Sequence, residues 1–245
     1  MGFHLHDLLS GFVRDDDSRQ LSVPALLGLA GQQVRPRLIL DFGCGDAADE
    51  REILQQFAGA SYVGVDVASS PEVHASAQPR PANFVVYDGS RLPFRSSSID
   101  LVYSRQVLEH LPNPQLALRE IRRVLRPEGL FVGSTSHLEA FHSYSYWNFT
   151  PYGLVRLGEE AGLRPVLVAP GIDSLALMLR RFVRSDGRHR WLERESPVNR
   201  LISLASRFKR WDHRYANCVK LQVCGHFFFI FRNGPAADRE RQGPS

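Results

Sequence analysis

The alternation of short apolar runs with helix-like segments along residues 37–232 predicts an α/β fold. Seven runs have the length and composition of strands, and the first contains Leu38, Ile39 and Leu40 in a row, as buried parallel strands do. Helical patterns separate most of these runs, so we expect a doubly wound, largely parallel sheet. The predicted strands cover residues 37–42, 62–66, 83–88, 99–104, 130–135, 165–169 and 226–231.

Two of the intervening helices have clear start signals. Asn113 followed by Pro114, and Thr150 followed by Pro151, place a capping side chain before a proline at the first helical position. We expect the first of these helices to end before Pro127. Its apolar face consists of Leu118, Ile121, Val124 and Leu125. The second is predicted over about 151–162, and another helix over about 47–57.

The chain divides into a main domain and three accessory segments. Its 245 residues, 43% of them hydrophobic, suffice for one sizeable core. We assign residues 37–232 to the main domain, 1–36 to an N-terminal helical cap and 171–215 to a helical insertion or lid before the last strand. Residues 233–245 are expected to form a disordered tail, because they are polar and rich in Gly and Pro.

Cysteine usage and hydropathy favour a cytoplasmic protein, and the preference for Arg over Lys favours a GC-rich bacterial genome. The 3 cysteines form no C-x-x-C pair, so a disulfide framework is not expected. The first residues have neither a basic start nor a long apolar run, which a secretion signal needs. The longest dense apolar run, 227–231, is too short to span a bilayer.

Positive charge is concentrated in the predicted insertion. Residues 180–214 contain eleven basic and four acidic residues, whereas the whole chain has a net charge of +4. Such a patch attracts phosphates, anionic lipid or nucleic acid, or is simply a solvated helix face. Nothing resembles a nucleic-acid-binding module, so no nucleic-acid partner is expected. Three roles stay open for the amphipathic insertion: a lid over the acceptor, a homodimer contact, or a peripheral contact with a membrane surface.

A glycine turn, "DFGCGDAADE" (41–50), follows the first predicted strand. Read literally, Gly43 and Gly45 match a dinucleotide fingerprint, which would place a pyrophosphate at a helix start. Acidic side chains crowd that start and would repel a pyrophosphate. These acids are Asp41, Asp46, Asp49 and Glu50. S-adenosylmethionine (SAM) has no phosphate and carries two cationic groups, so the acids favour SAM as the cofactor.

Two more acids end the next two predicted strands. Asp66 comes ~20 residues after the glycines, where a carboxylate can accept from both ribose hydroxyls of a nucleoside. Asp88, which precedes Gly89, could accept from the adenine amino group. Each acid alone could instead be a helix cap or a turn residue. Together with Asp41 they occupy three successive strand ends, which favours a single ligand site.

Five segments resemble, in order, the motifs of class I SAM-dependent methyltransferases of the type 11 branch: "LILDFGCGDA", "YVGVD", "VYDGSRLPF", "IDLVYSRQVLEHLPNP" and "EIRRVLRPEGLFVGST". The resemblance covers roughly residues 37–137 and implies a Rossmann-like, seven-stranded sheet whose last strand is antiparallel. It implies that Gly43 and Gly45 line the methionine part of SAM. The other implied positions are Asp66 with Val67 at the ribose, Asp88 and Gly89 at the adenine, and Ser104 and Arg105 beside the transferable methyl. Glu109 and His110 match an "EH" pair that is expected to be structural.

The segment "SHLEAFHSYSYWNFTPYGL" (136–154), after the fifth strand, is predicted to receive the methyl acceptor. Its aromatic and His residues suit a sugar or a phenolic ring, because Tyr and Trp faces stack while their polar tips hydrogen-bond. The segment also resembles a stretch of methyltransferases of polysaccharide synthesis, such as those of methylmannose polysaccharides. By that resemblance His142 is the general base, with Tyr146 and His137 beside it. The alternative is that His142 only bonds the backbone near the pocket.

The sequence therefore favours a SAM-dependent O-methyltransferase that acts on a hydroxyl of a sugar or oligosaccharide. Two alternatives stay open: a methyltransferase for a quinone, polyketide or other aromatic small molecule, and a SAM-binding module without turnover. His137, Glu139 and His142 could ligate a divalent metal such as Mg²⁺. Their spacing matches no strong metal motif, so no metal is predicted.

Overall fold

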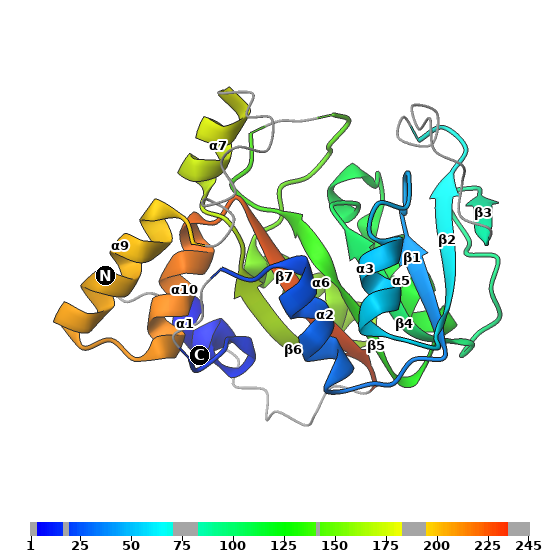
Figure 1. Cartoon of the computed structure of the whole chain (residues 1–245), viewed down its shortest axis with the longest axis horizontal. Coiled ribbons are helices and arrows are strands. Elements are labelled where there is room, and N and C mark those ends of the chain that lie inside the picture. Colours follow the sequence, from blue (N-terminus) through cyan, green and yellow to red (C-terminus); the bar gives the residue numbers. More distant parts are fainter. Residues whose placement is uncertain (1–3, 17–19, 71–82, 141–142, 183–194, 235–245) are drawn as a thin grey trace.

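A single seven-stranded sheet runs through the protein, with helices on both of its faces (Figure 1). The computed structural model describes residues 4–16, 20–70, 83–140, 143–182 and 195–234. The strands are β1 (Leu38–Phe42), β2 (Ser61–Val67), β3 (Phe84–Tyr87), β4 (Ile99–Arg105), β5 (Leu125–Ser136), β6 (Leu163–Pro170) and β7 (His226–Asn233). All seven predicted strands are thereby confirmed.

The strand order is β3-β2-β1-β4-β5-β7-β6. Neighbouring strands from β3 to β5 are parallel, whereas β7 is antiparallel to both β5 and β6. This arrangement confirms the predicted doubly wound sheet with an antiparallel last strand. The order reverses between β1 and β4, and in such sheets a ligand binds outside the carboxyl ends of the strands at the point of reversal.

Two apolar cores, one on each face of the sheet, hold the helices in place. In β7, Phe227, Phe229 and Phe231 join the core formed with α5, α6 and α10, while Phe228 and Ile230 join the core formed with α2 and α3. This is the two-residue alternation of a strand that is buried on both faces. The helices are α1 (His4–Leu9), α2 (Val23–Gly31), α3 (Glu50–Gln56), α5 (Pro114–Val124), α6 (Pro151–Glu160), α7 (Ser174–Phe182), α9 (Pro197–Lys209) and α10 (His213–Val223), with the 3₁₀ turns η1 (Ser10–Phe12) and η2 (Leu108–His110).

Both predicted helix caps are present. The Asn113 side chain accepts from the Leu116 amide at 3.1 Å, and Thr150 Oγ1 accepts from the Gly153 amide at 2.9 Å. Each cap satisfies an amide that has no partner within its own helix. These caps fix where α5 and α6 begin.

Three predicted boundaries were wrong. The helix expected over about 47–57 begins only at Glu50, because Ala47 has a φ of +57°, which no α-helix accommodates. Leu125 is extended and starts β5 instead of ending α5, because it pairs with Ile99 across the sheet. The helical insertion continues beyond residue 215 to Val223, since α10 docks its buried face under the sheet.

The insertion helices α7, α9 and α10 gather at one end of the molecule, on the left in Figure 1. Within the N-terminal segment, α1 contacts α10, and α2 packs against α3 on the opposite face. Of the predicted tail, residues 235–245 lie outside the described part, whereas Asn233 still belongs to β7. Among the described residues, no helix has both the length and the apolar character needed to cross a bilayer.

Candidate functional site

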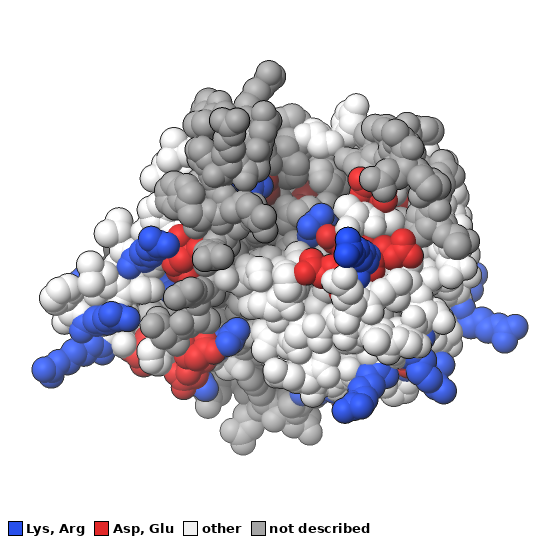
Figure 2. Space-filling model, in the orientation of Figure 1, with Lys and Arg blue, Asp and Glu red and all other residues white. Residues whose placement is uncertain are grey.

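The candidate site lies at the carboxyl ends of β1, β2 and β4, at the reversal of strand order. The surface is hollowed beside this edge, with charged side chains at the floor of the hollow (Figure 2). Acidic and basic side chains also alternate over the start of α3, where the sequence has Asp46, Asp49, Glu50 and Arg51. The strand ends thus bring the predicted cofactor residues to one edge of the sheet.

The glycine turn after β1 has a conformation that requires its glycines. Gly43 has a φ of +75° and Gly45 a φ of +54°, both in the left-handed region. A Cβ at Gly43 would lie 2.6 Å from Val107 Cγ1, so even a methyl group has no room there. The Gly43 amide donates to the Val65 carbonyl at 2.8 Å, which holds the turn against β2. The turn thus presents bare backbone at the strand ends.

Asp66 fastens this turn to the end of β2. Its Oδ2 accepts from the Gly45 amide at 2.8 Å and its Oδ1 from the Val67 amide at 2.7 Å, and the residue is 8% exposed. Hydrogen bonds from amides to a carboxylate are charge-assisted and strong. The carboxylate predicted to bind the ribose therefore also orders the glycine turn. The backbone amide of Val67, the other predicted ribose residue, holds this carboxylate in place.

The Asp41 side chain is buried beneath the glycine turn. The residue is 3% exposed, and the Tyr62 hydroxyl donates to its Oδ2 at 2.6 Å. Burial raises the pKa of Asp41 to about 7 and also raises the pKa of Tyr62. At neutral pH the carboxyl is therefore roughly half protonated, so its contribution to a negative field is smaller than the sequence argument assumed.

This raised pKa makes stability depend on pH. Below pH ~4 both folded and unfolded chains hold the Asp41 proton; between pH ~4 and ~7 only the folded chain does, so the stability of the fold falls as pH rises through that window. We expect Asp41→Asn to remove this loss, on the order of 2–4 kcal/mol in total. Urea unfolding from pH 4 to 8 measures it. Asp46→Asn, an exposed position in the same turn, is the control, and parallel curves for wild type and Asp41→Asn would contradict the assignment.

Arg105 and Tyr103, from the end of β4, both contact Asp49 in the glycine turn. Arg105 Nε lies 2.9 Å from Asp49 Oδ2, and the Tyr103 hydroxyl donates to the same oxygen at 2.8 Å. Between them on the strand, Ser104 is buried, and its Oγ has no hydrogen-bond partner among the described residues. β4 therefore brings the Arg105 guanidinium and the Tyr103 hydroxyl to the turn, while the implied place of Ser104 and Arg105 beside the methyl group stays a prediction. Asp49 holds the guanidinium there, a role that the sequence did not reveal.

Asp88 and Gly89 lie in an exposed turn after β3. Asp88 Oδ1 accepts from the amides of Ser90 at 2.8 Å and Arg91 at 3.0 Å, and these bonds hold the pKa of Asp88 at about 2. Gly89 has a φ of +81°. The carboxylate is thus ionised and shapes its own turn, which was the alternative role considered for such an acid.

The described part of the acceptor segment contains His137, Glu139 and Tyr146, while His142 lies outside the described residues. His137 Nδ1 lies 2.9 Å from the Phe149 carbonyl and donates to it, and burial lowers the pKa of His137. His137 is therefore a neutral side chain that joins two backbone segments. Tyr146 is 62% exposed, and its amide donates to the Glu109 carbonyl at 2.7 Å.

Glu109 and Glu139 form a buried acid pair that the sequence did not predict as a unit. Ser136 Oγ lies 2.9 Å from Glu109 Oε1 and 2.6 Å from Glu139 Oε2. One hydroxyl proton can serve only one of these carboxyl groups, so the other contact needs a protonated acid. Burial raises the pKa of Glu109 and so favours its protonated form. Glu109 also accepts from Thr135 Oγ1 at 2.9 Å, in agreement with its expected structural role.

In the part of the chain that the structure describes, no group of three or more His, Cys, Asp or Glu side chains is arranged to hold a metal ion. Of the alternative metal ligands, His137 bonds a backbone carbonyl and Glu139 contacts Ser136. The third, His142, is outside the described residues, so the metal alternative stays untested.

The sheet order and the glycine turn at its reversal define a class I methyltransferase fold. More particularly, residues 40–133 match the family model of a methyltransferase domain, type 11, which covers the turn and the ends of β1, β2 and β4. Among curated relatives, an uncharacterized methyltransferase of Mycobacterium marinum is 33% identical over 150 residues, which make up 60% of this chain and 52% of that protein. One of Mycobacterium tuberculosis is 37% identical over 109 residues, or 43% and 37% of the two chains. The chain spans about half the length of the curated relatives it matches.

Solved structures share the fold at low sequence identity. A geranyl diphosphate methyltransferase in complex with SAM superposes with a TM-score of 0.54 and 13% identity, covering 86% of this chain and 85% of that chain. The [4+2]-cyclase SpnF superposes with a TM-score of 0.53 and 16% identity, covering 96% of both chains. These likenesses establish the fold. They do not decide the reaction, since one of the two neighbours is described as a cyclase.

Proposed function

We propose that this protein transfers the methyl group of SAM to a hydroxyl of a sugar or oligosaccharide. The observation that carries the cofactor assignment is the Asp66 carboxylate, which is held by two backbone amides beside a glycine turn at the switch point of the sheet. The match of residues 40–133 to a methyltransferase domain supports the same assignment. When bound, SAM would supply an electrophilic methyl group on a cationic sulfur.

The residues present fit SAM. The missing Cβ of Gly45 would let the amino-acid part of SAM approach the backbone, while Gly43 lets the turn pack closely against Val107. Asp66 would accept from the ribose hydroxyls, and the ionised Asp88 beside Gly89 from the adenine amino group. Ser104, whose buried hydroxyl has no partner among the described residues, would face the methyl-bearing end together with Arg105.

Exposed aromatic side chains in the acceptor segment support a sugar as the acceptor. Tyr144 is 73%, Tyr146 62% and Trp147 46% exposed, although such large apolar rings are usually buried. The Trp147 indole donates to the Leu111 carbonyl at 2.9 Å, which fixes the orientation of its ring. Fixed, exposed rings stack on sugar faces, and Tyr hydroxyls bond sugar hydroxyls. The same rings would also stack on a planar quinone or phenol, which is the second candidate acceptor class.

Transfer of radiolabel from methyl-labelled SAM to a panel of acceptors tests this proposal. The panel contains mono- and disaccharides, a catechol and a hydroquinone. Labelled saccharide is the expected product, and labelled phenol alone would favour the second candidate. If calorimetry detects SAM binding but no acceptor is labelled, the protein is a binding module and the catalytic part of the proposal fails.

His142 is the proposed general base, since a sugar hydroxyl is too weak a nucleophile at neutral pH. His142→Ala is expected to lower turnover by about 10²-fold or more while SAM affinity stays unchanged, because a base acts on the acceptor and not on the cofactor. His213→Ala, an exposed histidine on α10, is the matched control. An unchanged rate in His142→Ala would remove the assignment and leave Glu139, in the same segment, as the next residue to test.

A further inference from the structure

Helix α9 exposes an apolar stripe. Leu201 is 64%, Leu204 51% and Phe208 81% exposed, and their spacing of three and four residues places them on one side of the helix. The opposite side carries Asn199, which is buried and donates to the Gly171 carbonyl. α7, which contacts α9, adds Leu175, Met178 and Leu179 to the exposed apolar residues. Exposed apolar residues that line up along one side of a helix, unlike scattered ones, are typical of a binding surface.

Cations surround this stripe. Between residues 195 and 223 the chain has six Lys or Arg residues and only two Asp or Glu residues. Arg200, Arg207, Lys209 and Arg210 lie on or directly after α9, and all four are exposed. On the helical wheel Arg200 and Arg207 border the stripe on one side. An apolar stripe bordered by cations is the pattern of a helix that lies in the plane of an anionic membrane surface.

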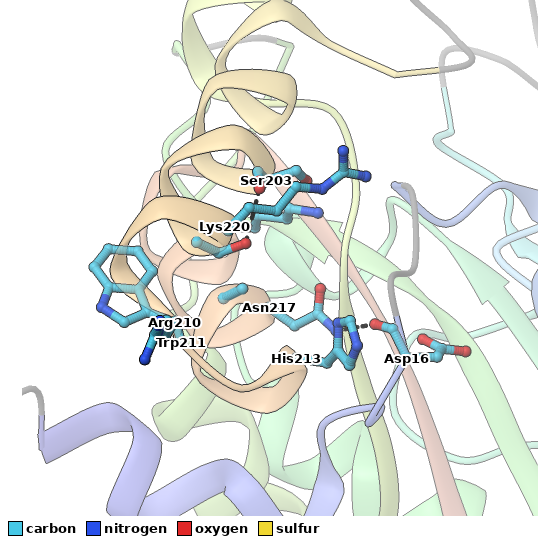
Figure 3. Close-up of a pocket in the computed structure, with 10 residues that line it drawn as sticks. Asp16, Ser203, Arg210, Trp211, His213, Asn217 and Lys220 are labelled. Carbon is cyan, nitrogen blue, oxygen red and sulfur yellow. Dashed lines mark hydrogen bonds between the residues drawn. The ribbon is translucent and has the colours of Figure 1, made fainter.

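The turn between α9 and α10 adds features that suit a lipid–water boundary. Lys209 Nζ lies 5.1 Å from the centroid of the Trp211 ring, which packs edge-on against Tyr215. Trp is favoured where an apolar layer meets water. Behind the turn lies a pocket of about 360 Å³, lined mostly by α9, α10 and the turn between them, with Arg207, Arg210 and Lys220 among its residues (Figure 3).

From these observations we infer that α9 docks this protein onto an anionic lipid bilayer, with Leu201, Leu204 and Phe208 inserted among the acyl chains and the flanking cations against lipid phosphates. The charge distribution disfavours a second copy of the chain on the same surface. A two-fold dimer would place the same patch against itself, so the cations of both copies would face each other. The inference does not depend on which reaction the protein catalyses.

Co-sedimentation with vesicles tests this inference on the full chain. We expect binding to vesicles of phosphatidylcholine with 30% phosphatidylglycerol at 50 mM salt, and weaker binding at 500 mM, because salt screens the cations. The double variant Leu201→Ser/Phe208→Ser should bind at least ~10-fold more weakly, since two apolar side chains no longer insert. Arg200→Gln/Lys209→Gln should bind roughly 25-fold more weakly at low salt, at about fivefold for each cation.

Matched controls keep the experiment decisive. Leu116→Ser and Arg119→Gln change exposed residues of α5 and should bind like wild type. Thermal unfolding shows that each variant is folded. Absence of binding to the anionic vesicles at low salt, or wild-type binding by Leu201→Ser/Phe208→Ser, overturns the inference. So does analytical ultracentrifugation that detects a dimer which Phe208→Ser dissociates, because a second copy would then cover the stripe.

Discussion

Replacing Asp66 with alanine is expected to abolish detectable SAM binding. The carboxylate accepts from the Gly45 amide at 2.8 Å and the Val67 amide at 2.7 Å, so the variant loses two charge-assisted hydrogen bonds, and the one from Gly45 orders the glycine turn. It also loses the proposed partner of the ribose hydroxyls. Each hydrogen bond from a ribose hydroxyl to this charged group is worth about 1.5–3 kcal/mol, so the loss of both, together with the loosened turn, should weaken binding by a factor of roughly 10³ or more. Isothermal titration calorimetry measures the affinity.

The control for this variant is Asp46→Ala in the same turn. Asp46 is exposed, and its Oδ1 accepts locally from the Ala48 amide at 3.2 Å. Its removal should leave SAM affinity within about threefold of wild type, since one exposed hydrogen bond contributes little. Near-normal affinity of Asp66→Ala, in a variant whose melting temperature shows that it is folded, would refute the role of Asp66.

The sheet could be predicted from the sequence because its signals are local. Each strand is a short apolar run, and in β7 every residue from Phe227 to Phe231 is buried, so the run itself marks a strand with cores on both sides. The caps Asn113 and Thr150 are equally local. The start of α3 was missed because the left-handed φ of Ala47 depends on how the turn folds over β2. An alanine in the sequence does not predict such a conformation.

The sequence predicts where the candidate site lies, but not which residues contact one another in it. Strand ends and glycines locate it, but the partner of each acid comes from a different strand. Tyr62 donates a hydrogen bond to the buried Asp41, and Arg105 contacts Asp49. Only the folded sheet brings the members of each pair together. Asp41 looks like a full negative charge in the sequence, whereas in the folded chain burial raises its pKa to about 7.

The buried acid pair, Glu109 and Glu139, is another contact that the sequence does not predict, and it lies near the predicted acceptor segment. Glu109 precedes α5 and Glu139 follows β5, and both contact Ser136, the last residue of β5. Gln106, at the end of β4, also reaches Ser136 and has a φ of +56°. A non-glycine residue in this region stores strain of about 1–3 kcal/mol, which persists where the surroundings enforce it. The fold therefore enforces a strained backbone position beside an acid pair at the ends of β4 and β5, next to the segment predicted to bind the acceptor.

Gly133→Ala is expected to prevent the protein from folding stably. Gly133 pairs with Ser104 where β5 runs beside β4, and a Cβ at this position would overlap the Ser104 carbonyl oxygen and lie 3.0 Å from Phe229 Cζ. The overlap is with backbone, so no side-chain rotation relieves it, and β4 and β5 would have to separate at the edge that carries Ser104 and Arg105. Overpacking in a well-packed core costs typically 1–3 kcal/mol when side chains can move, so we expect a loss of at least about 3 kcal/mol here.

Gly28→Ala also replaces a glycine with an alanine, but at this position we expect the change to stabilise the protein. Gly28 lies inside α2, and a Cβ added there meets no atom within 4 Å. Alanine is better than glycine in a helix interior by roughly 0.5–1 kcal/mol, because glycine loses more conformational freedom on folding. Urea unfolding of the two variants should therefore shift the midpoint in opposite directions. A Gly133→Ala variant as stable as wild type would mean that β4 and β5 do not approach each other as closely at Ser104 as the structure shows, and the assignment of that edge to the methyl-bearing end of SAM would lose its geometric basis.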